Sequence, residues 1–135
     1  MSRILVIDDD KFVRVSIGAV LRAAGHEVVE AGDADAGIAL YRGYPSDVVL
    51  VDIVMPNKEG LETIRELVRD FPGIRIIAIS GAGQIVSKNF ALTAKAFGAM
   101  AALEKPFGGD ELLAAVNTVA QTDPVPMPRA GGVNA

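Results

Sequence analysis

Acidic residues that follow apolar segments are the strongest candidates for chemistry in this chain. Asp8, Asp9 and Asp10 come directly after the apolar residues 4–7, and Asp52 follows the apolar residues 48–51. A carboxylate at the end of a buried strand is costly unless something uses it. Carboxylates 4 Å apart repel by about 4 kcal/mol at an effective dielectric near 20, so a crowded cluster requires a cation or must take up protons. Oxygen ligands with open water positions suit Mg²⁺.

A lysine and a serine follow two later apolar segments. Lys105 comes after the fifth apolar run, and Ser80 ends the fourth, before Gly81. The Lys105 ammonium can reach both the acids and a phosphoryl oxygen, and a hydroxyl beside a glycine N–H can bind phosphate oxygens. Singly, these features are better explained as a surface lysine, an ordinary turn and, at Asp10, a helix cap. Together they indicate a cation-dependent phosphate site.

Five short apolar, β-branched runs alternate with helix-like segments along the chain. The runs cover residues 3–7, 27–30, 47–51, 75–79 and 99–103, and the predicted helices cover residues 12–24, 33–41, 59–70, 84–97 and 110–121. Strands that are apolar throughout are usually buried on both faces, which favours a parallel sheet. The alternation therefore predicts an α/β fold with a doubly wound five-stranded parallel sheet and helices on both faces. In such sheets the ligand site lies outside the carboxyl ends of the strands, where the acids, Ser80 and Lys105 are expected.

Composition excludes several classes of protein. The chain has 135 residues, the usual size of one domain, and half of them are hydrophobic. It has no cysteine for a thiolate zinc site, and its only histidine, His26, is predicted at the opposite end of the sheet from the acids, so a serine or cysteine hydrolase is not supported. The net charge of −4 argues against direct nucleic-acid binding. No apolar stretch approaches the roughly 20 residues of a membrane span, and no signal peptide is visible. We expect no membrane partner and a cytoplasmic location.

The last residues differ in composition from the rest of the chain. Residues 122–135 contain Pro124, Pro126, Pro128 and the pair Gly131-Gly132, without apolar periodicity. We expect one domain over residues 1–121 and a flexible tail over residues 122–135.

Four motifs, each at the end of a predicted strand, together resemble the receiver domain of two-component response regulators of the stand-alone type. They are ILVIDDD at 4–10, VLVDIVMPN at 49–57 with Gly60, IIAISG at 76–81, and Lys105-Pro106-Phe107. The resemblance covers about residues 2–121. It implies a flavodoxin-like sheet with strand order 2-1-3-4-5.

By this resemblance Asp52 is the phosphoacceptor, which would attack a phosphoryl group carried on a partner's histidine. Asp9, Asp52 and the backbone carbonyl of Val54 would bind Mg²⁺ directly, with Mn²⁺ as a possible substitute, and Asp8 would hold the ion through water. Such a protein is not an enzyme beyond self-catalysed phosphotransfer and dephosphorylation.

Lys105 and the ion would offset the charge on the transferring phosphoryl group, and Ser80 would hydrogen-bond it once bound. The implied partners are a sensor histidine kinase or a histidine phosphotransfer protein, and a downstream protein target. One position departs from the family pattern. Many receivers carry Tyr or Phe three residues before the lysine as a switch coupled to the serine, whereas this chain has Ala102.

Two other functions remain open on the sequence. A haloacid-dehalogenase-type phosphatase would use Asp8 and Asp10 as its Asp-x-Asp motif, with Ser80 and Lys105 as later motifs. It would leave Asp52 without a role, and the chain has neither an acidic pair on a strand end after Lys105 nor an insertion large enough for a cap. A receiver-like binding module that acts without phosphorylation is the third possibility, which Ala102 makes conceivable.

Overall fold

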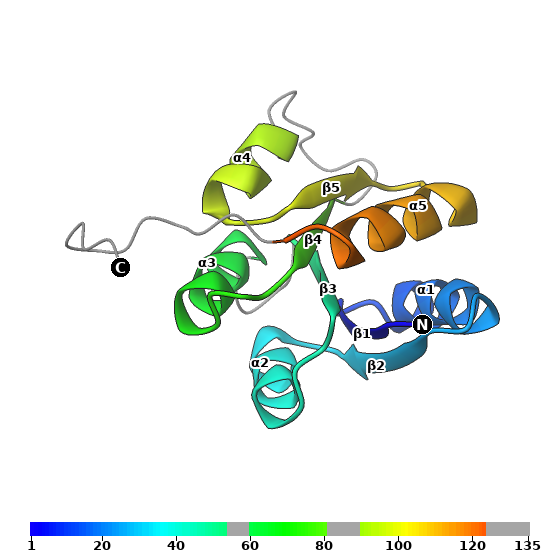
Figure 1. Ribbon diagram of the computed structural model, residues 1–135, viewed down its shortest axis with the longest axis horizontal. Helices are drawn as coiled ribbons and strands as arrows, with labels where there is room; N and C mark the ends of the chain where they lie inside the picture. The colour runs from blue at the N-terminus through cyan, green and yellow to red at the C-terminus, as the bar shows by residue number, and fades with distance from the viewer. Residues whose placement is uncertain (54–59, 81–89, 124–135) are drawn as a thin grey trace.

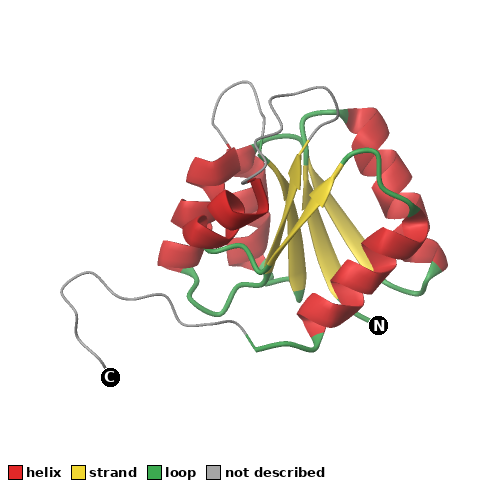
Figure 2. Ribbon diagram, turned by 90° about the horizontal axis from the view of Figure 1, so that it is seen from above, coloured by secondary structure: helices red, strands yellow, loops and turns green. Residues whose placement is uncertain are grey.

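The computed structural model describes residues 1–53, 60–80 and 90–123 and contains a five-stranded parallel sheet with helices on both faces (Figures 1 and 2). In chain order the elements are β1 (Arg3–Ile7), α1 (Lys11–Ala23), β2 (Glu27–Ala31), α2 (Ala34–Gly43), β3 (Val48–Asp52), α3 (Gly60–Asp70), β4 (Ile76–Ser80), α4 (Phe90–Phe97), β5 (Ala101–Glu104) and α5 (Gly109–Ala120). The strand order is β2-β1-β3-β4-β5. The predicted doubly wound, flavodoxin-like fold is therefore confirmed.

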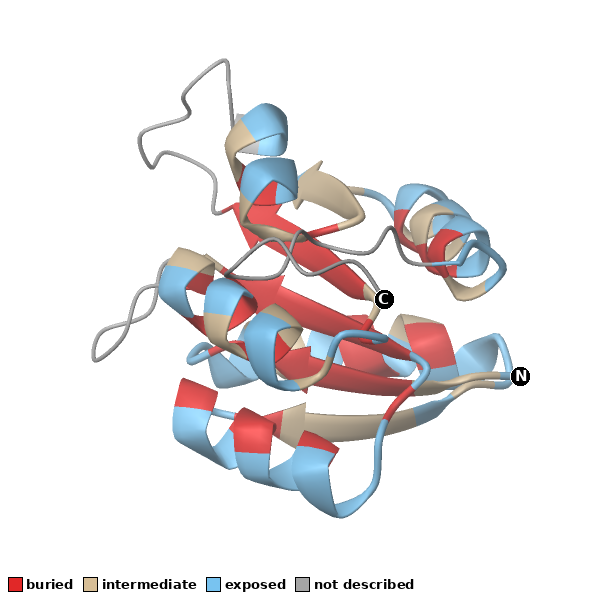
Figure 3. Ribbon diagram, turned by 60° about the vertical axis from the view of Figure 1, so that its left-hand side comes forward, coloured by how far each residue is buried: buried red, intermediate tan, exposed pale blue. Residues whose placement is uncertain are grey.

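Alternating side chains of the central strands supply two apolar layers. Leu5 and Ile7 face a core shared with α2, α3 and α4, whereas Ile4 and Val6 face a core shared with α1 and α5. Strands β3 and β4 are buried along their whole length, while the edge strands β2 and β5 are only partly covered (Figure 3). Burial on both faces explains why the central strands are apolar throughout.

Most element boundaries lie within two residues of those predicted. Strands β3 and β4 each begin and end one residue later than predicted. Asp52 still pairs with Ile79 at the end of β3, and Ser80 pairs with Glu104 at the end of β4. Strand β5 begins two residues late. Gly98 has a φ of 117°, and the N–H of Ala99 donates to the carbonyl of Ala94 at 3.0 Å, so these residues close helix α4 instead.

Helix starts follow the predicted capping. Asp10 accepts a hydrogen bond from the backbone N–H of Phe12 at 2.9 Å, and Asp33 accepts one from Ala36 at 2.8 Å. Residues 84–89 of the predicted fourth helix and nearly all of the predicted tail lie outside the described residues. Among the helices that are described, none has the length and apolarity required to cross a bilayer.

Candidate functional site

Among the described residues, three buried polar side chains lie at or just after strand ends on the carboxyl edge of the sheet. Asp8 follows β1 and is fully buried, while Asp52 and Ser80 end β3 and β4 and are 5% and 2% exposed. The register sets their positions, because Ile7 pairs with Val51 and so brings Asp8 beside Asp52. Neighbouring strands β1 and β3 lead to helices on opposite faces, which makes this edge the topological switch point of the sheet.

Asp8, Asp9 and Asp52 form the acid cluster. Each offers a carboxylate oxygen, and the three oxygens lie within 4.8 Å of one another. Asp8 and Asp52 are buried, whereas Asp9 is exposed and opens the cluster to solvent. The sequence prediction that these three acids converge is confirmed. Asp10 does not join them; its side chain caps α1, as the simpler interpretation proposed.

Lys105 extends over the acid cluster from the end of β5. Its Nζ lies 3.2 Å from Oδ2 of Asp8 and 3.8 Å from Oδ2 of Asp52. Its backbone N–H donates to the carbonyl of Ser80 at 2.8 Å, which ties the residue to the end of β4. The Lys105–Pro106 peptide bond is cis.

The charges of this group suit a divalent cation. Three carboxylates and one ammonium leave a formal charge of −2. Two carboxylates at 4.8 Å repel by about 3.5 kcal/mol at an effective dielectric of 20, which favours a bound cation over separate ionised acids. The donors are all oxygens, and the exposed side at Asp9 leaves room for water, as Mg²⁺ requires. The residues present therefore fit a hard divalent ion.

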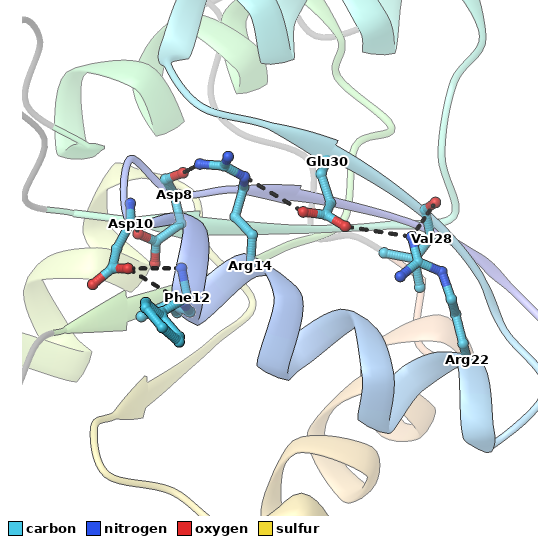
Figure 4. Close-up of polar contacts among 8 residues, drawn as sticks. Asp8, Asp10, Phe12, Arg14, Arg22, Val28 and Glu30 are labelled. Carbon is cyan, nitrogen blue, oxygen red and sulfur yellow. Dashed lines mark hydrogen bonds and ion pairs between the residues drawn. The ribbon is translucent and has the colours of Figure 1, made fainter.

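Backbone contacts fix the loop that carries Asp8 and Asp9. The N–H of Asp8 donates to the carbonyl of Ala31 at 3.1 Å, and Oδ1 of Asp8 accepts from the N–H of Asp10 at 2.9 Å. The carbonyl of Asp8 accepts a hydrogen bond from the guanidinium of Arg14 at 2.6 Å (Figure 4). Sequence reasoning did not single out Arg14, because an arginine on a helix has no local signal that distinguishes it from a solvated side chain.

Gly60 closes the other side of the site. A Cβ on this residue would lie 2.2 Å from the carbonyl oxygen of Asp52 and 2.2 Å from Cα of Ile53. Its N–H donates to the carbonyl of Ile53 at 2.9 Å. Only glycine allows the first turn of α3 to approach the end of β3 this closely.

Two further predictions concern Val54, as a metal ligand, and His26, as a residue remote from the acids. Val54, expected to supply a backbone carbonyl to the metal, lies outside the described residues, as does Gly81. His26 precedes β2 at the amino end of the sheet, where its Nδ1 accepts a hydrogen bond from the N–H of Ser2 at 3.0 Å. It is therefore remote from the acid cluster, as predicted.

The strand order together with the acids after β1 and β3 defines a flavodoxin-like α/β protein with a polar site at the switch point. Comparison with known proteins gives the family. Residues 4–117 match the sequence model of the response regulator receiver domain, and the chain belongs to this family.

Relatives of several kinds align with the chain. It is 36% identical to protein PilH of Pseudomonas aeruginosa and 32% identical to the chemotaxis protein CheY of Thermotoga maritima; each match covers 88% of this chain and 98% of the relative. The crystal structure of the NtrX receiver domain from Brucella abortus superposes with a TM-score of 0.81 at 31% identity, over 88% of this chain and 98% of that one. The chain spans only 26% of a longer NtrX chain from the same organism.

Proposed function

We propose that Asp52 accepts a phosphoryl group from a phosphohistidine in a Mg²⁺-dependent reaction and that the chain signals by contact with other proteins. The observation that carries this proposal is the placement of Asp52 at the switch point, 5% exposed, with two further carboxylates and the Lys105 ammonium around it. A buried carboxylate crowded by like charges is an expensive arrangement. Phosphoryl transfer would give each of these groups a role: Asp52 as the nucleophile, the other two carboxylates in binding the ion, and the ammonium in offsetting charge.

In the proposed reaction a carboxylate oxygen of Asp52 attacks the phosphorus of the donor. The new O–P bond forms as the P–N bond to the imidazole breaks, and the bonding pair stays on the imidazole nitrogen. An ionised carboxylate is already a nucleophile, so no general base is needed, and none is required from His26. The ammonium of Lys105 lies 3.8 Å from Asp52 in this structure. It would contact a phosphoryl oxygen and offset its negative charge.

The acid cluster would hold the ion. Asp9, Asp52 and the carbonyl of Val54 would bind Mg²⁺ or Mn²⁺ directly, and Asp8 would act through water. The ion would neutralise the phosphoryl oxygens and hold the group in line with the attacking oxygen. Water attack on the same acyl phosphate would reverse the modification, which makes the chain a self-dephosphorylating switch rather than an enzyme with a separate substrate.

Ser80 is the proposed contact from the phosphoryl group to the output surface. Its side chain is 2% exposed at the end of β4, and Ser80 pairs with Glu104, directly before Lys105. A hydroxyl here would donate to a phosphoryl oxygen and bias the chain toward a second conformation. The downstream target would be a protein that recognises this conformation.

The donor would be a histidine kinase or a histidine phosphotransfer protein in the cytoplasm. Phe12, on the first turn of α1, would provide an apolar contact for such a protein, because this residue is 85% exposed. Aromatic side chains, Phe among them, are enriched in protein–protein interfaces relative to the rest of the surface. Phe12 lies two residues after the Asp10 cap and is drawn beside it in Figure 4.

The test is to locate the phosphoryl group by mass spectrometry after incubation with Mg²⁺ and either acetyl phosphate or a histidine-phosphorylated donor protein. We expect one phosphoryl group on Asp52, lost in Asp52→Asn and retained in Asp35→Asn, an exposed acid on α2. Attachment at Asp8 would support the phosphatase instead. A target protein that binds Asp52→Ala as tightly as the wild-type chain, with or without chelator, would support a phosphorylation-independent module.

The two donors separate chemistry from docking. Phe12→Ala should slow transfer from the protein donor and leave transfer from acetyl phosphate unchanged. Equal rates from the protein donor would remove Phe12 from the interface without touching the proposed role of Asp52.

A further inference from the structure

A continuous line of polar contacts runs from the acid cluster to the edge strand β2 (Figure 4). Its central residue is Arg14, at the end of the first turn of α1. One guanidinium nitrogen, Nη1, donates to the carbonyl oxygen of Asp8 at 2.6 Å, and Nε lies 3.5 Å from Oε1 of Glu30. The Arg14 side chain is only 17% exposed, so its position is set by packing as well as by these partners.

The position of the Asp8 carbonyl gives this contact its importance. That oxygen belongs to the peptide group that joins Asp8 to Asp9, and both residues are members of the acid cluster. A hydrogen bond from a charged donor is roughly twice as strong as one between neutral groups. The Arg14 contact therefore restrains the peptide plane between the two acids through a backbone atom.

The chain leaves room for this guanidinium. A Cβ at Gly32 would lie 3.3 Å from Nη1 of Arg14, closer than side-chain carbons normally come, so a larger residue would press on it. The other carboxylate oxygen of Glu30 contacts Arg22, whose Nη2 lies 3.4 Å from Oε2 of Glu30. Glu30 thus joins two arginines, of which only Arg14 touches the acid cluster. Arg22 instead donates to the carbonyl of Val28.

We propose that Arg14 is a positioning residue for cation binding: anchored by Glu30, it holds the Asp8–Asp9 peptide so that the acid cluster presents its oxygens to a divalent ion. The charge of Arg14 is matched by Glu30, so its action is mainly geometric. Residues that orient metal ligands typically contribute 10- to 100-fold to metal affinity. The proposal rests on the proposed function only in requiring that the acid cluster binds a divalent ion.

A purely structural role would have a different signature. If Arg14 served only to fasten α1 to the edge of β2, its loss would lower the melting temperature and leave the affinity of the folded protein for metal unchanged. Arg22→Ala is the matched control, because Arg22 contacts the same Glu30 from the same helix and has no contact with Asp8.

The experiment measures Mg²⁺ affinity by calorimetry and Mn²⁺ affinity by loss of the free-ion paramagnetic resonance signal, well below each variant's melting temperature. Arg14→Ala should weaken both ions by about tenfold or more. Arg14→Lys should recover only part of this loss, because one ammonium cannot reproduce the two-sided contact of a guanidinium. Glu30→Gln should give a smaller loss, and Arg22→Ala should bind as the wild-type chain does.

The outcomes separate the two proposals. Wild-type affinity in Arg14→Ala, or an equal loss in Arg22→Ala, would overturn the positioning role and leave the proposed function standing. Absence of Mg²⁺ and Mn²⁺ binding in the wild-type chain would overturn both. If Arg14→Ala does not fold, Arg14→Lys and Glu30→Gln decide the matter: weakened binding in both supports the proposal, and wild-type binding in both overturns it.

Discussion

The crowding of the acid cluster predicts that removing one acid stabilises the metal-free protein. Asp9→Asn is the clearest variant, because Asp9 is the exposed member and is absent from the ion pairs that Lys105 makes with Asp8 and Asp52. Its carboxylate repels two neighbours whose oxygens lie within 4.8 Å. Each repulsion amounts to about 3.5 kcal/mol at an effective dielectric of 20 and about 0.9 kcal/mol in bulk water.

Because Asp9 is exposed, we expect each repulsion energy to lie near the lower figure, the one for bulk water. Two water-screened pairs together give about 2 kcal/mol, which we expect as the increase in the free energy of unfolding in chelator. For a domain of this size that increase corresponds to a rise of about 8 °C in melting temperature. Added Mg²⁺ should reverse the order of stability, because a ligand at 100 times its Kd stabilises the wild-type protein by about 2.7 kcal/mol and the variant lacks one ligand.

The assay is thermal and urea unfolding of both proteins in chelator and in saturating Mg²⁺, followed by circular dichroism. Asp35→Asn removes the same charge from an exposed site in the first turn of α2 and should change stability by less than about 0.5 kcal/mol. High salt should reduce the gain in Asp9→Asn. Lower stability of Asp9→Asn in chelator, or equal stabilisation of both proteins by Mg²⁺, would refute the reasoning.

Two further substitutions test the elements that hold the site. Gly60→Ala places a Cβ 2.2 Å from the carbonyl oxygen of Asp52 and should cost more than about 3 kcal/mol in urea unfolding, with weakened Mg²⁺ binding, since backbone atoms cannot yield as a flexible side chain does. Asp10→Ala removes the cap that accepts from the N–H of Phe12 and should cost about 1 kcal/mol. Its Mg²⁺ affinity should stay at the wild-type value, because the contact of this residue with Asp8 is made by the backbone N–H.

The fold could be predicted from the sequence because burial and pairing leave few alternatives. Strands covered on both faces must be apolar throughout, and the fully buried β3 and β4 show this pattern without interruption. The predicted element boundaries were wrong where local hydrogen bonding competed with the apolar pattern. Ala99 reads as strand in the sequence, yet its N–H closes α4.

The convergence of the acids could also be predicted, because all carboxyl ends of parallel strands meet at one edge of the sheet. The distances between the site's side chains could not be predicted. The sequence does not determine that Lys105 reaches Asp8 more closely than Asp52, since side-chain rotamers and strand twist set those distances. Nor did it show that Arg14 turns back toward the Asp8 carbonyl, because its partners lie in the loop after β1 and in β2 and have no fixed spacing in the chain.

Ala102 changes how a signal would leave the site. It pairs with Ala78 in the β4–β5 ladder, and both residues belong to the apolar layer shared with α4. Neither residue has an aromatic ring that could change position together with Ser80. Lys105 provides another connection, because its ammonium contacts Asp8 and Asp52 while its backbone N–H donates to the carbonyl of Ser80. A phosphoryl group that draws the ammonium from the acids would act on the ends of β4 and β5 through one residue. We therefore expect coupling in this chain to depend on the Lys105 backbone and on Ser80 rather than on an aromatic switch.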